Sequence, residues 1–273
     1  MIIASLNLHA GYGADGRPFD VVTACRELDA DLILLQEAWQ PAGRPDPAAA
    51  AARALGAQLI RADLLAGTSL SRLGIAPDAR HGRWGLAVLT ALPVTGYQRV
   101  ALGRFPGDPI GRVAQLVTVT TPAGDSLVVA NAHLTHRFFS PVQLLRLTRR
   151  LATNGAAVIA GDLNMPAPVT GLAAGYSAAV SGRTFPAHRP LIQLDHVLTG
   201  RGLRGCDGQV LPPVGSDHLP VRARVQALKL VASLVIHSIL LPASAALLPA
   251  YRYGQTVAVS AGFSVLSFPV TVP

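Results

Sequence analysis

The chain has 273 residues, of which 50% are hydrophobic and 14% are charged, and its formal net charge is +8. This length allows one large domain or two small ones with a sizeable buried core. The basic residues are scattered, which excludes a nucleic-acid-binding arm, and the two cysteines fit no metal or redox spacing. All 15 acidic residues lie before residue 228, whereas the last 46 residues carry only two charges, so we divide the chain into a body, 1–227, and a tail, 228–273.

The charge of the body comes from arginine alone. Its 21 arginines face 15 acidic residues, and the net charge of +6 mildly favours phosphate-bearing ligands. The N-terminus has no basic segment followed by an apolar one, so we expect no signal peptide and a cytoplasmic body. Cys25 falls on the apolar face of a predicted helix, which indicates a buried, reduced thiol.

In chain order, the residue patterns of the body predict many short strands with interspersed helices. Helices are expected after Asp20, over 48–55 and from Ser140, where a cap residue precedes Pro141. Residues 63–83 are expected to form one long connection. Apolar runs and period-two alternation predict strands over 2–6, 31–37, 84–90, 112–120, 126–132, 157–160, 193–198 and 221–225.

The stretch Ala157–Pro166 is the centre of the predicted site. Four small or branched apolar residues form a buried strand, and Asp162 and Asn164 follow it two residues apart. If the chain stays extended there, both side chains point to the same side. A carboxylate beside an amide suits proton transfer and the orientation of a polarised oxygen. The alternative is a turn in which both side chains bond their own backbone.

Polar side chains also end the other predicted strands. Side chains that converge from strand ends are a common way for α/β scaffolds to build active sites. Each residue type has a structural alternative, because a glutamate is usually solvated, a lone histidine is often structural and a Ser-Asp pair often caps a turn. The strand-end set is Asn7, Glu37, His133, Asp162, Asn164, Asp195, Asp217 and His218.

The motifs around these residues occur in a characteristic order: Ser5-Leu6-Asn7, Gln36-Glu37, Asn131-Ala132-His133-Leu134, Gly161-Asp162-Leu163-Asn164, Leu194-Asp195-His196 and Ser216-Asp217-His218-Leu219-Pro220-Val221. Over nearly all of residues 2–225, the chain resembles the endonuclease/exonuclease/phosphatase superfamily, the metal-dependent phosphoesterases that include DNase I. The resemblance implies an α/β fold, a DNase I-like four-layer sandwich of two mixed, mostly antiparallel sheets flanked by helices.

By resemblance, the strand-end residues divide into a metal group and a catalytic group. The expected metal ligands are Asn7, Glu37 and Asp217, since Mg²⁺ or Mn²⁺ prefers hard oxygen atoms. The resemblance makes Asp162 the candidate base for the attacking water, oriented by Asn164, and pairs Asp195 with His218, which contacts the phosphate. The choice of base between Asp162 and His218, and the number of metal ions, stay open. The expected catalytic residues are His133, Asp162, Asn164, Asp195 and His218.

Two arginines are candidate substrate-binding residues. Arg112 begins a predicted strand where the family often places a phosphate-contacting arginine. Arg189 lies in Thr184–Pro190, which resembles the segment ahead of the family's Asp-His strand. For both, an ordinary surface arginine is the alternative. No motif supplies the acidic partner that backs the first histidine in DNase-like members.

These features together predict a monomeric, metal-dependent hydrolase of phosphate esters, acting by in-line attack of water on phosphorus. The substrate class stays open between nucleic acid and phospholipid or inositol phosphate. One alternative is a membrane-associated lipid or inositol-phosphate phosphoesterase. The alternative from another class is a catalytically silent phosphate-binding protein on the same fold, although a pure binder gains little from an intact metal carboxylate and Asp/His pairs.

The tail is the most apolar part of the chain. Residues 230–250 carry no formal charge and are about long enough to span a bilayer, which predicts membrane association through this segment. His237, Pro242 and Pro249 interrupt the segment and argue against a regular membrane helix. The other interpretations are an extra packed element or sequence that runs past the natural end of the domain near residue 226.

Overall fold

The computed structural model describes residues 1–76, 80–108, 110–136, 138–228, 260–261 and 264–265. It divides into two units, Met1–Leu230 and Val231–Pro273. The described part of the second unit is one antiparallel pair, β13 (Ser260–Ala261) and β14 (Ser264–Val265). The anchor expected at 230–250 lies outside the described residues. In the part of the chain that the structure describes, no helix has the length and apolar character needed to cross a membrane.

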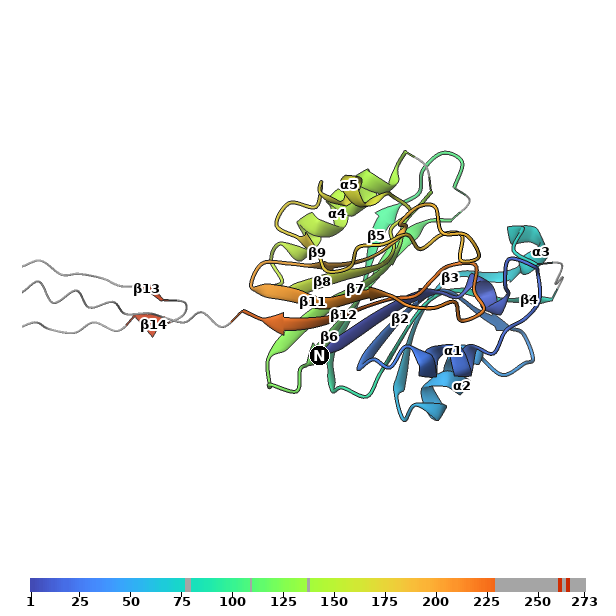
Figure 1. Ribbon diagram of the computed structural model, residues 1–273, viewed down its shortest axis with the longest axis horizontal. Coiled ribbons are helices and arrows are strands. Elements are labelled where there is room, and N and C mark those ends of the chain that lie inside the picture. Colours follow the sequence, from blue (N-terminus) through green and yellow to red (C-terminus); the bar gives the residue numbers. More distant parts are fainter. Residues whose placement is uncertain (77–79, 109, 137, 229–259, 262–263, 266–273) are drawn as a thin grey trace, which may run out of the picture. The chain divides into compact units, whose positions relative to one another are not determined.

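Two six-stranded sheets form the first unit (Figure 1). In the first sheet the strand order is β11-β12-β1-β2-β4-β3, with β1 (Ile2–Asn7), β2 (Leu32–Pro41), β3 (Gln58–Ser69), β4 (His81–Thr90), β11 (Leu203–Val210) and β12 (Val221–Ala227). In the second sheet it is β5-β6-β7-β8-β10-β9, with β5 (Val94–Gly103), β6 (Arg112–Thr120), β7 (Ser126–His133), β8 (Ala157–Asp162), β9 (Ser177–Ala178) and β10 (Asp195–Thr199).

Each sheet contains one parallel pair among antiparallel neighbours. β1 pairs with β2 and β7 pairs with β8 in parallel. Because parallel neighbours need a crossover, a helix stands between the two strands of each pair. This helix is α1 (Val21–Glu27) in the first sheet and α4 (Ser140–Leu151) in the second. The carboxyl ends of β1, β7 and β8 carry their motif residues to one edge of the unit, and the Gln36-Glu37 motif lies within β2 beside the end of β1.

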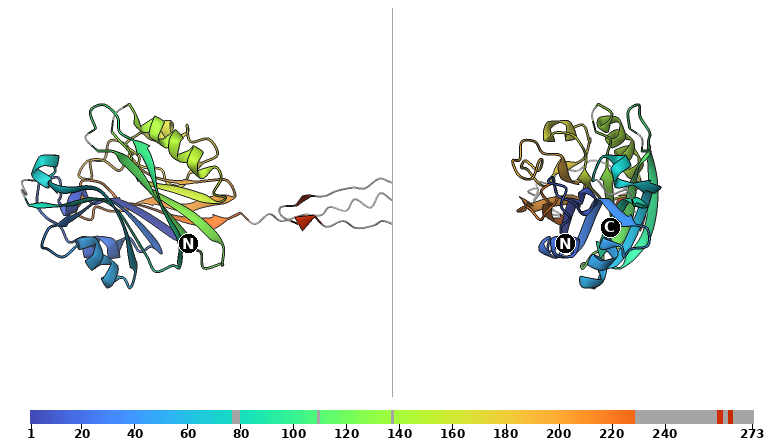
Figure 2. Two further views of the ribbon diagram at one scale, coloured as in Figure 1. Left: turned by 180° about the vertical axis from the view of Figure 1, so that it is seen from behind. Right: turned by 90° about the vertical axis from the view of Figure 1, so that its right-hand side faces the viewer.

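The two sheets pack face to face between layers of helices. Ile3 and Leu34 of the first sheet share a buried cluster with Val129 and Val158 of the second. The outer face of the first sheet is covered by α1 and α2 (Pro47–Ala54), and that of the second by α4 (Figure 2). The helices α3 (Leu70–Leu73), α5 (Ala167–Thr170) and the 3₁₀ turn η1 (His9–Gly11) are short. The predicted four-layer α/β sandwich is confirmed.

The sequence patterns identified the central strands and missed the edges. Residues 63–83, expected as one connection, contain the end of β3, the helix α3 and the start of β4. The strands without a prediction, β3, β5, β9 and β11, are the four edge strands of the two sheets. An edge strand has one neighbour and a partly exposed face, so its sequence is not constrained to an apolar run or a regular alternation.

The first helix has the local features that the sequence predicts, whereas the start of α4 differs. Asp20 caps α1 by accepting a hydrogen bond from the Val22 N–H, as predicted. Cys25 is a free, buried thiol whose pKa is raised to about 12 by burial. Ser140, however, is not the cap of α4, because the helix has Phe139 at that position and the Ser140 hydroxyl donates to the Asn164 carbonyl, 3.4 Å away.

A buried polar network joins the sheets directly beneath the predicted site. The Gln36 amide donates to Asn131 Oδ1 at 2.7 Å, across the gap between β2 and β7. The Asn131 amide donates in turn to the carbonyls of Leu35 and Ala87, at 3.1 and 3.0 Å. Buried amides need partners, so this network favours a single register between the sheets. Because Glu37 directly follows Gln36, fixing Gln36 against Asn131 also fixes the position of Glu37 at the site.

Candidate active site

The predicted site residues converge on one pocket of about 350 Å³ at the edge where the strands end. Asp195 stands behind His218, and Arg189 is exposed and lies outside the pocket lining. A larger, mainly apolar cavity of about 810 Å³ near Met1 contains none of the predicted residues. Those that line the smaller pocket are Asn7, Glu37, Arg112, His133, Asp162, Asn164, Asp217 and His218.

Glu37 is presented by a bulge within β2. The strand does not end at Glu37 as expected; it continues to Pro41, with a register shift against β4 between Leu35 and Ala38 and a Glu37 φ of 50°. A bulge of this kind re-aims a side chain, and here it turns the carboxylate into the pocket. Burial raises the pKa of Glu37. Its Oε2 is buried with no hydrogen-bond partner among the described residues, which leaves one oxygen to hold a cation.

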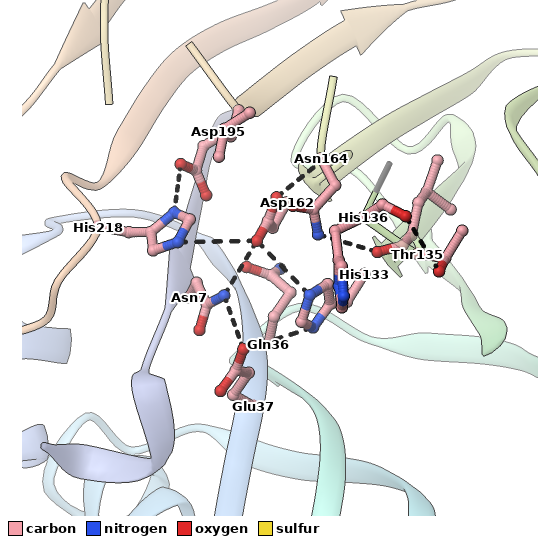
Figure 3. Close-up of polar contacts among 12 residues, drawn as sticks. Asn7, Gln36, Glu37, His133, Thr135, His136, Asp162, Asn164, Asp195 and His218 are labelled. Atoms are coloured by element: carbon pink, nitrogen blue, oxygen red, sulfur yellow. Dashed lines mark hydrogen bonds and ion pairs between the residues drawn. The ribbon is translucent and has the colours of Figure 1, made fainter. Parts of the chain in front are cut away.

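Asn7 connects the two carboxylates of the pocket. Its amide nitrogen donates to both carboxylates (Figure 3), at 3.3 Å to Glu37 Oε1 and 3.1 Å to Asp162 Oδ2. Its Oδ1 accepts the backbone N–H of His9 at 2.9 Å. This oxygen keeps a second lone pair, so Asn7 stays a predicted ligand beside the carboxylates of Glu37 and Asp217.

Asp162 and Asn164 form a turn at the end of β8. Asn164 has a φ of 51°, and its backbone N–H donates to Asp162 Oδ1 at 2.9 Å. The chain is thus not extended at this point, and the premise that alternation aims both side chains is wrong, because the short Asp side chain bonds the backbone two residues on. Both side chains nevertheless line the pocket, with the Asn164 amide donating to the Leu134 carbonyl at 3.0 Å.

The structure forms the predicted pair between Asp195 and His218. Asp195 Oδ2 lies 2.8 Å from His218 Nδ1, and the other imidazole nitrogen lies 3.8 Å from Asp162 Oδ2. Phe185 packs on the imidazole, with ring centroids 4.7 Å apart. Burial opposes a charge on His218, but Asp195 and Asp162 outweigh it and raise the pKa of the imidazole to about 10.

Asp162 lies between the two histidines. His133 Nε2 is 3.6 Å from Asp162 Oδ2, on the side opposite His218 (Figure 3). Burial raises the pKa of Asp162 to about 7, against the opposing charge of His218. Burial lowers the pKa of His133 well below its usual range, and the nearby Arg112 adds to this effect. His133 therefore stays neutral where His218 is charged.

The Nδ1 side of the His133 imidazole differs from the Nε2 side, which faces Asp162. Its Nδ1 is buried without a hydrogen bond in the described structure, and the Glu37 carboxylate is 4.0 Å away. Its backbone carbonyl instead lies 3.5 Å from Arg112 Nη1. Arg112 also donates from Nε to Asp108 Oδ2 at 2.8 Å, so this buried guanidinium is held in place at the pocket wall.

Sequence reasoning missed Asp108 and left His9 out of the site. Asp108 lies in an irregular loop, and neither periodicity nor a motif distinguishes it in the sequence. Its contact with Arg112 is formed only in the folded protein. His9 lines the pocket, with Nδ1 3.0 Å from the Tyr12 carbonyl and 3.7 Å from Asp217 Oδ1. The sequence did offer one indication that His9 belongs to the site, which is its position two residues after Asn7. Phe185 lies within the Thr184–Pro190 segment, but no role was predicted for it.

The donor atoms of the site include one group with metal-ligand spacing among the described residues. Ligand atoms of Asp162, Asp195 and His218 all lie within 4.8 Å of one another. Together with the partnerless oxygen of Glu37, the pocket is rich in hard oxygen donors, which suit Mg²⁺ or Mn²⁺ better than soft metals. The arrangement is suited to hold a cation beside two imidazoles and an arginine, and so to bind a phosphate group.

A family model described as the Endonuclease/Exonuclease/phosphatase family matches residues 4–218. The chain belongs to this family. Members of the family are phosphoesterases and are typically metal-dependent, so the protein is a phosphoester hydrolase, as the sequence predicted, and it has a group of residues that could hold a metal ion. A comparison with curated proteins found no match.

Solved structures share the endonuclease/exonuclease/phosphatase fold at low sequence identity. A family protein from Beutenbergia cavernae has a TM-score of 0.62 at 21% identity, covering 83% of this chain and 71% of its own. The human Nocturnin catalytic domain has a TM-score of 0.64 at 17% identity, covering 84% and 94%. A mannosyl-6-phosphatase from Bacteroides thetaiotaomicron has a TM-score of 0.61 at 13% identity, covering 83% and 99%.

Proposed function

We propose that this phosphoesterase hydrolyses its substrate by attack of water on phosphorus, activated by Asp162, with Mg²⁺ or Mn²⁺ bound beside Glu37. One observation carries the proposal: both imidazoles and the Asn7 amide converge on Asp162 Oδ2, at 3.8, 3.6 and 3.1 Å, in the pocket that also holds the partnerless Glu37 oxygen. A structural role alone does not require this many polar groups on one buried carboxylate.

The residues present fit a divalent cation of the hard type. Glu37 offers a buried oxygen without a partner, and Asp217 adds a second carboxylate at the same pocket. Such ions take one or two protein carboxylates and keep several waters. When bound, the ion would polarise the phosphate oxygens and lower the pKa of a coordinated water. The number of Mg²⁺ ions bound per chain, measured by titration, would show whether the group of Asp162, Asp195 and His218 holds a second ion.

The electrostatics support Asp162 over His218 as the base. A general base works best with a pKa near the operating pH, and burial raises the pKa of Asp162 to about 7. His218, with a pKa raised to about 10 by Asp195 and Asp162, keeps its proton at neutral pH. It is suited to donate to a phosphate oxygen as negative charge develops, while neutral His133 and Arg112 contact the phosphate from the other side.

The substrate is proposed only as a phosphate ester that fits a pocket of about 350 Å³. One structural neighbour is a mannosyl-6-phosphatase, so phosphomonoesters belong in a substrate panel together with diesters. We include plasmid DNA, abasic DNA, RNA, sphingomyelin and inositol phosphates, each with and without EDTA. The class of compound that the protein hydrolyses fastest would identify the substrate class.

Turnover of bis-p-nitrophenyl phosphate tests the proposed chemistry. We expect Mg²⁺-dependent hydrolysis that EDTA stops, and a loss of about a hundredfold or more in kcat for Asp162→Ala and for His218→Ala. Asp207→Asn is the matched control, since this exposed carboxylate pairs with Arg224 far from the pocket lining and its loss is expected to leave kcat unchanged. Hydrolysis that survives EDTA or both alanine variants would overturn the proposal, and phosphate binding without turnover would identify a silent binder.

A further inference from the structure

Exposed apolar side chains lie close in the chain to residues that line the pocket. Phe138 is 90% exposed and lies two residues beyond His136, which lines the pocket. Leu191 is 61% exposed, in a loop closed by the bridge between Phe185, another lining residue, and Ile192. Exposed apolar side chains that gather near an active site mark an interaction surface.

The apolar side continues along the first turns of α4. Val142 and Leu145 are exposed three residues apart in α4, so they lie on one side of the helix, and Phe138 lies in the turn just before the helix. Leu144 and Leu147 point the other way and pack into the core of the second sheet. The helix therefore has two apolar faces, of which the fold uses only one.

The surroundings of this face are basic. From residue 126 to residue 194 the chain contains six arginines, and its only acidic residue is Asp162, which is buried in the pocket. Arg149 and Arg150 are exposed near the end of α4, and Arg183 and Arg189 are exposed in the segment that contains Phe185. A segment that combines exposed apolar side chains with arginines is complementary to an interface that is apolar inside and anionic outside.

We propose that the mouth of the pocket docks on an anionic lipid surface, with Phe138 and Leu191 entering the interface and the arginines contacting headgroups. The proposal rests on the proposed function for its chemistry, and it names the substrate class as a phosphate ester carried by a lipid headgroup. Nucleic acid is disfavoured because single-stranded binding relies on aromatic stacking platforms, whereas here the exposed set is aliphatic except for Phe138.

A tryptophan introduced by Phe138→Trp in the full chain reports on the contact directly. Trp39 and Trp84 are buried, so the added indole is the exposed one. With vesicles of brominated phosphatidylcholine containing phosphatidylglycerol, we expect quenching and a blue shift of the added emission, both lost in high salt and with phosphatidylcholine alone. Phe138→Asp is expected to weaken partition onto the anionic vesicles about tenfold.

Two controls distinguish docking through the pocket mouth from binding through the tail and from binding to nucleic acid. Tyr97→Trp places an indole on an exposed position of β5, outside the pocket lining, and is expected to stay unquenched even if the tail holds the protein on the vesicle. Equal quenching at both positions, no quenching at position 138, or a response of Phe138→Trp to DNA but not to vesicles would overturn the proposal. Quenching without hydrolysis of bis-p-nitrophenyl phosphate would uphold the docking surface and reject the proposed function.

Discussion

Asp162 is buried between His133 and His218, and the protein keeps a carboxylate there although ionising it costs free energy. Three donors partly compensate: the Asn7 amide, the Asn164 backbone N–H and the charged His218. Burial still prevails, since the pKa of the carboxyl is raised from 3.8 to about 7. A buried carboxylate of this kind is expected at an active site, where the burial that lowers stability also brings the pKa close to the pH at which the enzyme works.

Asp162→Asn is therefore expected to stabilise the metal-free protein while abolishing turnover. The folded pKa lies above the unfolded one, so the ionised carboxylate disfavours folding, and this penalty grows as pH rises from about 4 through about 7. Denaturant unfolding in EDTA should give the variant an advantage on the order of 3 kcal/mol at about pH 8, shrinking toward zero at about pH 4. A variant less stable than the wild type at the higher pH would contradict this account.

At the scale of elements, the site depends on two departures from regular strands. The bulge in β2 turns Glu37 inward, and the end of β8 turns sharply at Asn164. Just before that turn, Gly161 has a φ of 143°, and a Cβ at this position would lie 1.9 Å from the Ala132 carbonyl oxygen. Backbone contact this close means that β7 and β8 can bring His133 beside Asp162 only if residue 161 is glycine.

Gly161→Ala is expected to cost about 3 kcal/mol or more, because it combines a strained φ with a backbone clash that no side-chain movement relieves. Gly124→Ala is the matched comparison: Gly124 also has a positive φ, 86°, but a Cβ there meets nothing within 4 Å, so a cost of about 1 kcal/mol is expected. Equilibrium unfolding of both variants gives the two values. Equal costs would show that the close approach to Ala132 is unimportant.

At the scale of the molecule, the active site lies across the join between the two sheets. Asn7 and Glu37 belong to the first sheet, whereas His133, Asp162 and Asp195 belong to the second. The pair between Asp195 and His218 and the bond from Asn7 to Asp162 cross this join. A cation held by Glu37 and positioned against Asp162 would consequently stabilise the packing of one sheet on the other.

Mg²⁺ is thus expected to raise the free energy of unfolding of the whole domain. Binding to the folded state alone contributes about 3 kcal/mol at a free concentration about a hundredfold above Kd. Thermal unfolding in Mg²⁺ and in EDTA measures the difference as a shift in Tm. Glu37→Gln should lose most of the shift, while Asp207→Asn, whose carboxylate is exposed and away from the pocket, should keep it. A full shift in Glu37→Gln would place the cation elsewhere.

Much of this protein was determined locally by its sequence. Buried central strands such as β2 and β8 carry continuous apolar runs because both of their faces are covered, and the Asp20 cap of α1 depends on neighbouring residues only. The strand-end polar residues were recognisable for a related reason, since carboxylates and imidazoles directly after apolar runs stand out. The edge strands lack such a signal, because one face and one edge are free of the core.

Only the tertiary structure decided which of these residues meet. Asn7 and Asp162 are 155 positions apart and lie within hydrogen-bond distance, and Asp108 joins Arg112 from a loop without any pattern. The Glu37 bulge was invisible in the sequence, because it is a shift of β2 against its neighbour β4, whereas the turn at Asn164 was one of two alternatives that the sequence left open. Periodicity encodes which side chains are buried, whereas distances, shifted pKa values and the exposed face of α4 arise from the packing of one sheet on the other.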